Sequence, residues 1–118
     1  MKVVKKHQLN GKENLQPIRI LISGKENETD SCLAGLAFLY PGQRIPSSGF
    51  LLHPTEKFVY VKSGTIRIET HKEWDVAEEG DLILMPPYEP HFNVNISDKQ
   101  AELLWCRTDK PLCSLSRK

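Results

Sequence analysis

The sequence lacks an excess of charge of either sign, because 16 lysines and arginines are balanced by 15 aspartates and glutamates. Proteins that grip nucleic acids by the phosphate backbone carry clustered basic residues, so this balance argues against a nucleic-acid partner. The chain also lacks a long hydrophobic run, and no segment approaches the roughly 20 apolar residues of a membrane helix. The lysine-rich start "MKVVKK" precedes no apolar run of the kind found in signal peptides. We therefore expect a cytoplasmic protein that binds neither membranes nor nucleic acids.

Cysteine is scarce as well. Cys32, Cys106 and Cys113 are odd in number and lack the C-x-x-C spacing of zinc sites, so we expect reduced thiols. The sequence contains no nucleophile elbow and no phosphate-cradling glycine loop. Any catalysis would depend on a metal acting as a Lewis acid, or on Glu56, Lys57 or a histidine acting as an acid or base. The sequence leaves open whether the protein is an enzyme.

In place of helical periodicity, the sequence has short apolar runs separated by turn residues, which is typical of all-β proteins. About eight or nine such runs in one domain predict a β-sandwich or a small barrel. The barrel is expected over residues 16–108, with an N-terminal arm or edge strand over residues 1–15 and a C-terminal tail over residues 109–118. The predicted strands cover residues 18–23, 32–40, 50–54, 57–64, 65–70, 82–87, 91–96 and 101–107, and a short strand falls within residues 72–81.

Side chains alternate between the two faces of a strand, so the sequence also predicts which of them enter the barrel. If His53 points inward, Lys57 should point inward with it and Glu56 should face outward. In a later strand, His91 should share its face with two asparagines. The inward positions would then include Leu51, Val59, Val61, Asn93 and Asn95, and the outward positions would include Phe58 and Tyr60.

Three stretches, "PGQRIP", "LLHPTEKFVYVKSG" and "EEGDLILMPPYEPHFNVN", lie between Pro41 and Asn95. With their turns at Gly64 and Gly80, they resemble the two sequence motifs of the cupin superfamily. This resemblance covers about half of the chain and implies a single-domain cupin jelly-roll β-barrel. Cupins usually hold one divalent metal with two histidines and a glutamate from the first motif and a third histidine from the second.

In this chain the metal-binding pattern is incomplete. Leu51 takes the place of the first histidine and Lys57 that of the glutamate, whereas His53 and His91 match. The resemblance implies a divalent transition metal (Zn, Fe, Mn or Ni) held by His53, His91 and Glu56, provided that a bulge turns Glu56 inward. Without the bulge, the ammonium group of Lys57 would enter the barrel, where it would repel a cation and favour an anion.

Three interpretations of the two histidines stay open: a metal site, a metal-free pocket for an acidic small molecule, and a polar core without a ligand. The first predicts a small cupin that binds or transforms an acidic or sugar-like molecule. The second predicts a non-catalytic module that binds an anion or a sugar, with Lys57 among its contacts. Other residues expected near the ligand are Tyr88 at the barrel mouth, Asn93 and Asn95 beside His91, and Phe38 and Trp105 in strands that should line the barrel.

A homodimer is the expected assembly. The resemblance implies that two copies pair through sheet faces and the N-terminal strand, and outward Phe58 and Tyr60 would suit such a buried surface. A structural or interaction role for the barrel is therefore a third hypothesis beside the two ligand-binding ones.

Overall fold

The structure of the protein is a computed structural model that describes residues 3, 5, 18–22 and 32–108. The predicted tail over residues 109–118, which includes Cys113, and most of the predicted arm over residues 1–15 lie outside the described residues. Where the chain is described, it consists of strands and the turns between them. No helix that is long and apolar enough to pass through a membrane occurs in these ranges.

Most strands lie close to the ranges that the sequence predicts. The predicted strand over residues 50–54 is wrong, because this segment forms only an isolated bridge between Leu51 and His91. The chain bends at Pro54 and Thr55, and proline has no N–H group with which to extend a ladder. The short strand β3 was not predicted. The strands are β1 (Ile18–Ile22), β2 (Cys32–Leu39), β3 (Arg44–Ile45), β4 (Lys57–Ser63), β5 (Thr65–Thr70), β6 (Trp74–Glu78), β7 (Leu82–Met85), β8 (His91–Asn95) and β9 (Ala101–Thr108).

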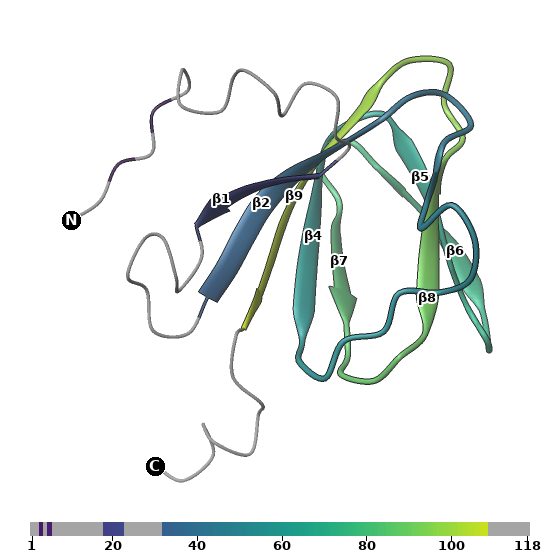
Figure 1. Ribbon diagram of the computed structural model, residues 1–118. Helices are drawn as coiled ribbons and strands as arrows, with labels where there is room; N and C mark the ends of the chain where they lie inside the picture. Colours follow the sequence, from purple (N-terminus) through teal and green to yellow (C-terminus); the bar gives the residue numbers. More distant parts are fainter. Residues whose placement is uncertain (1–2, 4, 6–17, 23–31, 109–118) are drawn as a thin grey trace, which may run out of the picture.

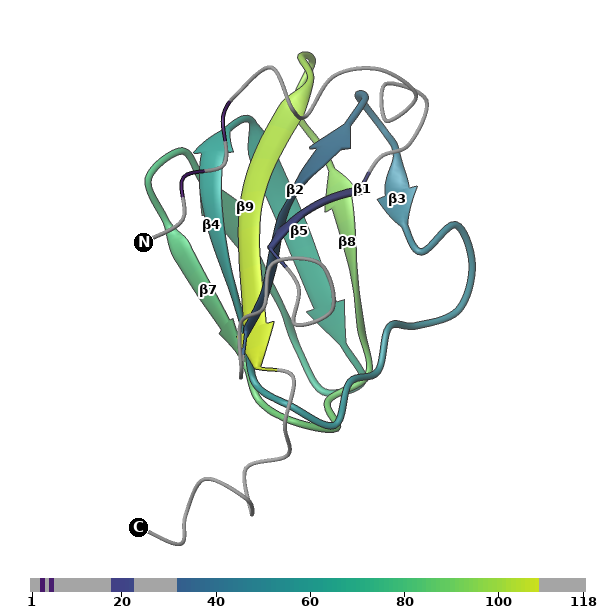
Figure 2. The same ribbon diagram turned by 60° about the vertical axis from the view of Figure 1, so that its left-hand side comes forward.

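These strands form two antiparallel sheets (Figures 1 and 2). The larger sheet has the order β1-β2-β9-β4-β7, and the smaller sheet has the order β3-β8-β5-β6. Several neighbours are distant in sequence, since β9 pairs with both β2 and β4 and β8 pairs with both β3 and β5. This arrangement confirms the predicted all-β jelly-roll architecture.

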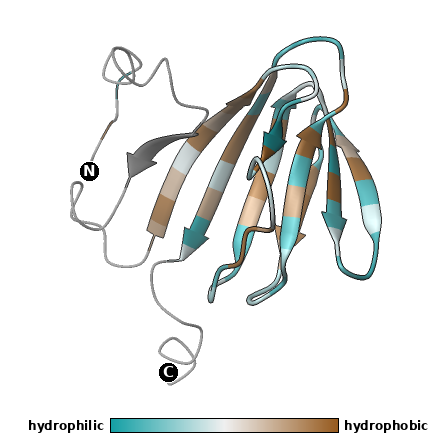
Figure 3. Ribbon diagram, turned by 45° about the vertical axis from the view of Figure 1, so that its right-hand side comes forward, coloured by the Kyte–Doolittle hydropathy of each residue, from teal (hydrophilic) through white to brown (hydrophobic). Residues whose placement is uncertain are grey.

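Alternating side chains build the core between the sheets. In β4, Lys57, Val59 and Val61 are only 7%, 4% and 0% exposed, whereas Phe58 and Tyr60 are 42% and 41% exposed. The predicted faces of this strand are therefore confirmed. Figure 3 shows the alternation as brown and teal bands along the strands. Each fully buried aliphatic side chain contributes about 1.5–3 kcal/mol to stability, and those of the core include Leu39, Ile66, Ile68 and Leu103.

Asn95, at the end of β8, is fully buried and links three parts of the fold. Its amide nitrogen donates hydrogen bonds to the carbonyl oxygens of Leu39 (2.9 Å) and Lys99 (2.8 Å). Its amide oxygen accepts from the backbone N–H (2.9 Å) and the hydroxyl group (2.6 Å) of Ser97. These four bonds use both donors and both lone pairs of the amide. Asn95 therefore joins β2, β8 and the turn before β9, and its side chain has no hydrogen bond left to offer a ligand.

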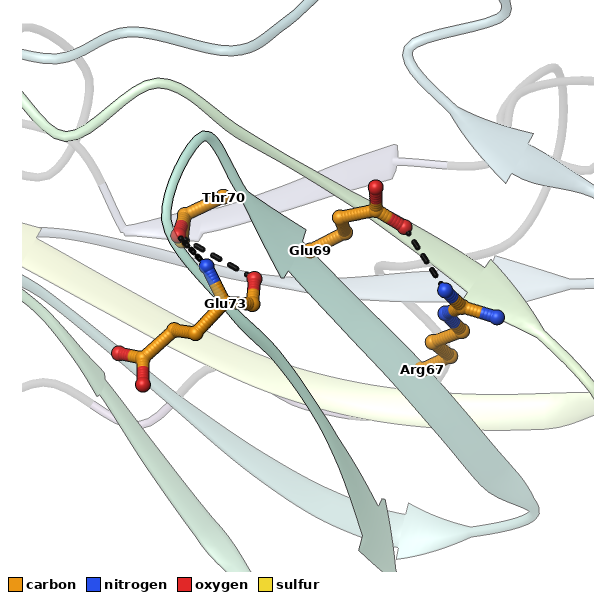
Figure 4. A network of polar contacts seen from close by, with 4 residues as sticks. All are labelled: Arg67, Glu69, Thr70 and Glu73. Atoms are coloured by element: carbon orange, nitrogen blue, oxygen red, sulfur yellow. Dashed lines mark hydrogen bonds and ion pairs between the residues drawn. The ribbon is translucent and has the colours of Figure 1, made fainter.

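Thr70 closes the turn between β5 and β6 (Figure 4). Its hydroxyl oxygen accepts hydrogen bonds from the backbone N–H groups of Lys72 (3.1 Å) and Glu73 (3.2 Å). Its own backbone N–H donates to the carbonyl oxygen of Glu73 at 2.8 Å. Earlier in β5, Arg67 and Glu69 form an ion pair of 3.1 Å. Such a surface ion pair contributes about 0–1 kcal/mol to stability. The hairpin therefore depends mainly on its backbone hydrogen bonds.

Gly64, in the tight turn between β4 and β5, is predicted to tolerate no side chain. Its φ is +88°, and a Cβ there would lie 2.7 Å from the Cβ and 2.8 Å from the Cα of Ala101. We expect Gly64→Ala to lower the free energy of unfolding by at least about 3 kcal/mol, because left-handed strain adds to a clash with buried backbone. Urea denaturation followed by circular dichroism measures this loss.

Gly80→Ala is the matched control for this measurement. Gly80 has a similar φ of +94°, but a Cβ at this position would meet nothing within 4 Å. Only the left-handed strain remains, so the expected loss is about 1–2 kcal/mol. Equal losses for the two variants would contradict the importance of the close approach between Gly64 and Ala101.

Candidate functional site

A cavity of about 220 Å³ lies between the two sheets, near the start of β4 and the end of β9. Both sheets and the segment before β4 contribute to its wall. The apolar lining consists of Leu33, Ala37, Ile45, Leu51, Val59 and Leu103. The lining residues with polar groups are His53, Lys57, Asn93, Trp105 and Arg107, and the described residues contribute no acidic side chain to the lining.

Two positive charges face this cavity side by side. Lys57 on β4 and Arg107 on β9 are directly paired in the register of the two strands, so their side chains leave the sheet on the same face. Residues paired in this way have Cβ atoms about 4.5–5.5 Å apart, and like charges at such positions repel each other. Within the described residues, neither side chain has a hydrogen bond or an ion pair. The pair therefore presents two unneutralised cations to the cavity.

The pKa values of the cavity residues reflect burial among these charges. Burial first, and the charge of Arg107 second, lower the pKa of Lys57 to about 8. Burial also lowers the pKa of His53 to about 4, with smaller contributions from the charges of Lys57, Arg107 and His91. At neutral pH, His53 is thus a neutral imidazole, whereas most Lys57 side chains still carry a charge.

His91 lies beside His53, with 6.2 Å between the ring centroids, and is only 1% exposed. Burial lowers its pKa, against an opposing effect from a hydrogen bond to the Glu89 backbone. Its Nδ1 lies 2.8 Å from the carbonyl oxygen of Glu89, which can only accept, so Nδ1 carries the hydrogen in this bond. The other ring nitrogen, Nε2, is buried and has no hydrogen-bond partner among residues 18–22 and 32–108. The neutral ring therefore turns an unshared lone pair into the protein interior.

The residues present do not fit the metal site that the sequence motifs imply. The bulge that would turn Glu56 inward does not occur, because Lys57 occupies the inward position and Glu56 is not among the cavity residues. In the part of the chain that the structure describes, no three His, Cys, Asp or Glu residues lie close enough together to hold a metal ion. The two imidazoles remain as donors, but a catalytic metal usually has three protein ligands, and two nearby cations oppose its binding.

The other predicted ligand-binding residues fall into two groups. Asn93 is buried and lines the cavity, whereas Asn95 is engaged in the backbone links described above. Tyr88 has an exposed side chain outside the lining and a φ of 62°, and its backbone N–H donates to the carbonyl oxygen of His53 at 2.7 Å. Tyr88 therefore helps to position His53 through its backbone. Trp105 lines the cavity as expected, but Phe38 does not, because Ala37 and Leu39 take the inward positions of β2.

Arg107 is the cavity residue that sequence reasoning missed. The strand pattern contained the signal, since every second residue of β9 lies on one face of the strand, and this series runs Ala101, Leu103, Trp105, Arg107. Arg107 is the last of this series, near the end of the strand, where alternation alone does not tell whether a long side chain turns inward or into solvent.

A larger groove of about 470 Å³ opens between β6 and β7, the edge strands of the two sheets. Its polar lining includes the carboxylates of Glu73, Asp75, Asp81 and Glu89, and the described residues provide it with no basic side chain. None of the site residues predicted from the sequence lies in its wall. The smaller cavity, lined by the buried Lys57 and by the half-buried Arg107 and His53, is therefore the candidate functional site.

Comparisons with known proteins agree with this fold. A family model described as "Cupin domain" matches residues 36–107, which is more than half of the chain. A search of the curated proteins found none that matches.

Several solved structures are similar to the whole barrel. The TT1209 protein of Thermus thermophilus is 21% identical, with a TM-score of 0.69, and the match covers 94% of this chain and 100% of that one. The polyketide cyclase RemF of Streptomyces resistomycificus is 19% identical, with a TM-score of 0.73 and coverage of 93% and 80%. A sugar phosphate isomerase from a cupin superfamily of Silicibacter pomeroyi is 24% identical, with a TM-score of 0.65 and coverage of 84% and 64%. At these identities the likeness establishes the fold alone.

The buried charge of Lys57 is predicted to lower the stability of the free protein. A pKa of about 8 in the folded chain, against 10.5 for an ordinary lysine, corresponds to a cost on the order of 3 kcal/mol at neutral pH. We therefore expect Lys57→Met to raise the free energy of unfolding at pH 7. The gain should shrink between pH 8 and pH 10.5, because the folded wild type then loses the proton that its unfolded chain still binds. Urea denaturation at pH 7 and pH 9.5 measures both effects.

Lys62→Met is the matched control, since Lys62 lies on the same strand but on its exposed side, in an ion pair of 3.1 Å with Glu102. Its replacement should change stability by less than about 1 kcal/mol at either pH. A loss of stability in Lys57→Met at pH 7, or a gain that does not depend on pH, would show that the Lys57 charge is not buried as described.

Proposed function

The chain belongs to the cupin domain family, and from this membership we propose that its barrel binds a small organic anion, a carboxylate or a phosphate, without a metal. Family and fold do not choose among ligands, because one fold hosts many different sites. The observation that carries the proposal is the pair of cations, Lys57 and Arg107, at a cavity to which no acidic residue in the described part of the chain contributes.

An anion between the two cations would relieve two unfavourable interactions. The ammonium group of Lys57 has lost hydration on burial, and it lies beside the guanidinium group of Arg107. A carboxylate or phosphate would accept charge-assisted hydrogen bonds from both groups, and such bonds are roughly twice as strong as neutral ones. The planar guanidinium group can also hold either anion with two parallel hydrogen bonds. Binding energy would thus come from two charges that no described carboxylate neutralises.

The size and walls of the cavity limit the ligand. A volume of about 220 Å³ equals roughly seven water molecules at liquid density, so the ligand is a small molecule. Its body contacts aliphatic side chains such as Leu33 and Leu103, while the amide of Asn93 can both donate and accept a hydrogen bond. One structure of similar fold is described as a sugar phosphate isomerase, so a barrel of this kind can be associated with an anionic molecule in another protein.

The alternative function is a divalent metal held by His53 and His91, with a small acidic or sugar-like molecule bound or transformed beside it. Glu56 would be a third ligand only if the segment before β4 turned it inward. Its support is the proximity of the two imidazole rings and the unpartnered Nε2 of His91. The inward Lys57 and its neighbour Arg107 favour the anion instead, because both repel a cation. A chelator separates the two alternatives in the measurement below.

The outer face of the larger sheet supports the expected homodimer. The side chains of Phe58 and Tyr60 on β4 lie opposite Leu84 and Leu82 on β7, and Tyr60 lies opposite Leu104 on β9. All five side chains are between 40% and 62% exposed. A contiguous apolar surface of this kind commonly marks a protein interface. We propose that a second copy of the chain covers this face.

Light scattering coupled to size-exclusion chromatography tests the dimer. We expect twice the chain mass at micromolar concentration, and about half of that mass for Phe58→Asp, because a buried carboxylate would be left without a partner. Ile96→Asp, at an exposed apolar position directly after β8 of the other sheet, should keep the dimeric mass. A wild-type monomer at this concentration would rule out the proposed interface.

Thermal unfolding with added anions tests the proposed ligand class. We expect acetate, propionate, lactate or inorganic phosphate at saturating concentration to raise the melting temperature by several degrees, because these anions bind only the folded chain. The shift should weaken as the pH rises through about 8, because Lys57 then loses its positive charge. It should persist after dialysis against a chelator, since no metal takes part.

Variants locate the effect in the cavity. Lys57→Met and Arg107→Gln should each abolish most of the anion-dependent shift relative to their own ligand-free melting temperatures, whereas Lys62→Met should retain it. No shift with any of the anions would refute the proposed function. A shift that disappears with the chelator and returns with a divalent metal would favour the alternative.

A further inference from the structure

The amino group of Lys57 binds an anion through its charge, but it can also act as a nucleophile, and anion binding does not use this reactivity. A primary amine is a nucleophile once it loses its proton, and this one is buried in a largely aliphatic cavity with a second cation beside it. These are the two circumstances under which lysines form covalent bonds with carbonyl compounds. No described carboxylate lies in the lining to hold the proton on the ammonium group.

We propose that Lys57 forms an imine with a small 2-oxo acid whose carboxylate is held by the guanidinium group of Arg107. This inference rests on the proposed function, since it assigns the bound anion to one chemical class. In a 2-oxo acid the carbonyl carbon is bonded directly to the carboxylate carbon. The ligand therefore needs an amine and a carboxylate-binding cation close together, which is the arrangement of Lys57 and Arg107 in the register of β4 and β9.

The covalent step needs no oxidant, reductant or further reactant. The ammonium group first gives up a proton, and the lone pair of the resulting amine attacks the carbonyl carbon as the C=O π bond opens. The oxygen takes up a proton to give a carbinolamine. Loss of this oxygen as water then leaves a C=N bond, so that amine and ketone become imine and water.

The geometry of the cavity suits the covalent step. The register that pairs Lys57 with Arg107 places the amine beside the group that holds the carboxylate. Solvent water takes up the proton that the ammonium group releases and supplies the proton that the oxygen takes up. The aliphatic wall also limits the access of water that would hydrolyse the imine.

Borohydride trapping with pyruvate tests the proposal. Reduction turns an imine into a stable secondary amine, so the mass of the intact chain should increase by that of pyruvate less one water plus two hydrogens. We expect one such adduct per chain, located at Lys57 by peptide mapping. Lys57→Arg, which keeps the positive charge but lacks the amine, and Lys57→Met should both lose it. Lys62→Arg, on the exposed side of the same strand, should form the adduct as the wild type does.

Arg107→Gln separates the binding of the carboxylate by Arg107 from the formation of the imine by Lys57. Loss of a charge-assisted contact to the carboxylate should slow the trapping of pyruvate at least about tenfold. Trapping of propanal, an aldehyde without a carboxylate, should change by less than about twofold in the same variant. A similar decrease with both compounds would overturn the assignment of Arg107 as the carboxylate-binding group.

The result with lactate, which has the carboxylate but no carbonyl group, distinguishes failure of this inference from failure of the proposed function. If lactate and pyruvate both stabilise the wild type but pyruvate forms no adduct at Lys57, the imine is refuted and the anion site stands. Adducts scattered over exposed lysines, at the same level in Lys57→Arg, also refute the imine. If neither compound stabilises the chain and no adduct forms, both proposals fail.

Discussion

Two like charges held side by side inside a barrel are the constraint on which the cavity depends. Lys57 and Arg107 cannot separate by a change of register, because the pairing of β4 with β9 that aligns them also aligns the core residues of the same strands. Slipping by one residue would turn every inward side chain of β4 outward. The contacts that stabilise the core therefore enforce the repulsion. Burial is the main cause of the lowered pKa values of Lys57 and His53, and this repulsion lowers both further.

The two ends of the barrel have different physical characters. At one end, where Leu39 pairs with Ala101, the amide of Asn95 is fully hydrogen-bonded and Gly64 packs tightly against Ala101. At the other end, the described residues provide neither a counter-ion for Lys57 and Arg107 nor a partner for Nε2 of the buried His91. Unsatisfied groups of this kind persist only where surrounding structure holds them, and they concentrate at functional sites. We infer that the tightly packed end, with Asn95, Gly64 and Ala101, helps to hold the cavity residues in place.

The sequence was sufficient for local features but not for long-range ones. Alternation along β4 predicted the inward side chain of Lys57, because a strand's period of two depends only on its own backbone. Alternation did not decide whether a bulge would turn Glu56 inward in place of Lys57. The presence of a bulge depends on how β4 pairs with β7 and β9. Alternation also placed Asn95 on the face of His91. Whether that amide meets a ligand or a carbonyl group depends on where β8 ends against β2, a contact of residues 56 positions apart in the chain.

The inward position of Lys57 has an evolutionary consequence. The codons for lysine and glutamate differ in one base, and a glutamate at this position would stand with two imidazoles in place of the ammonium group. One nucleotide exchange would therefore replace the ammonium group at position 57 by a carboxylate, which could act with the two imidazoles as a metal ligand. The contacts of Asn95 and Gly64 lie at the opposite end of the barrel, so an exchange at position 57 alters the charge of the cavity without disturbing them.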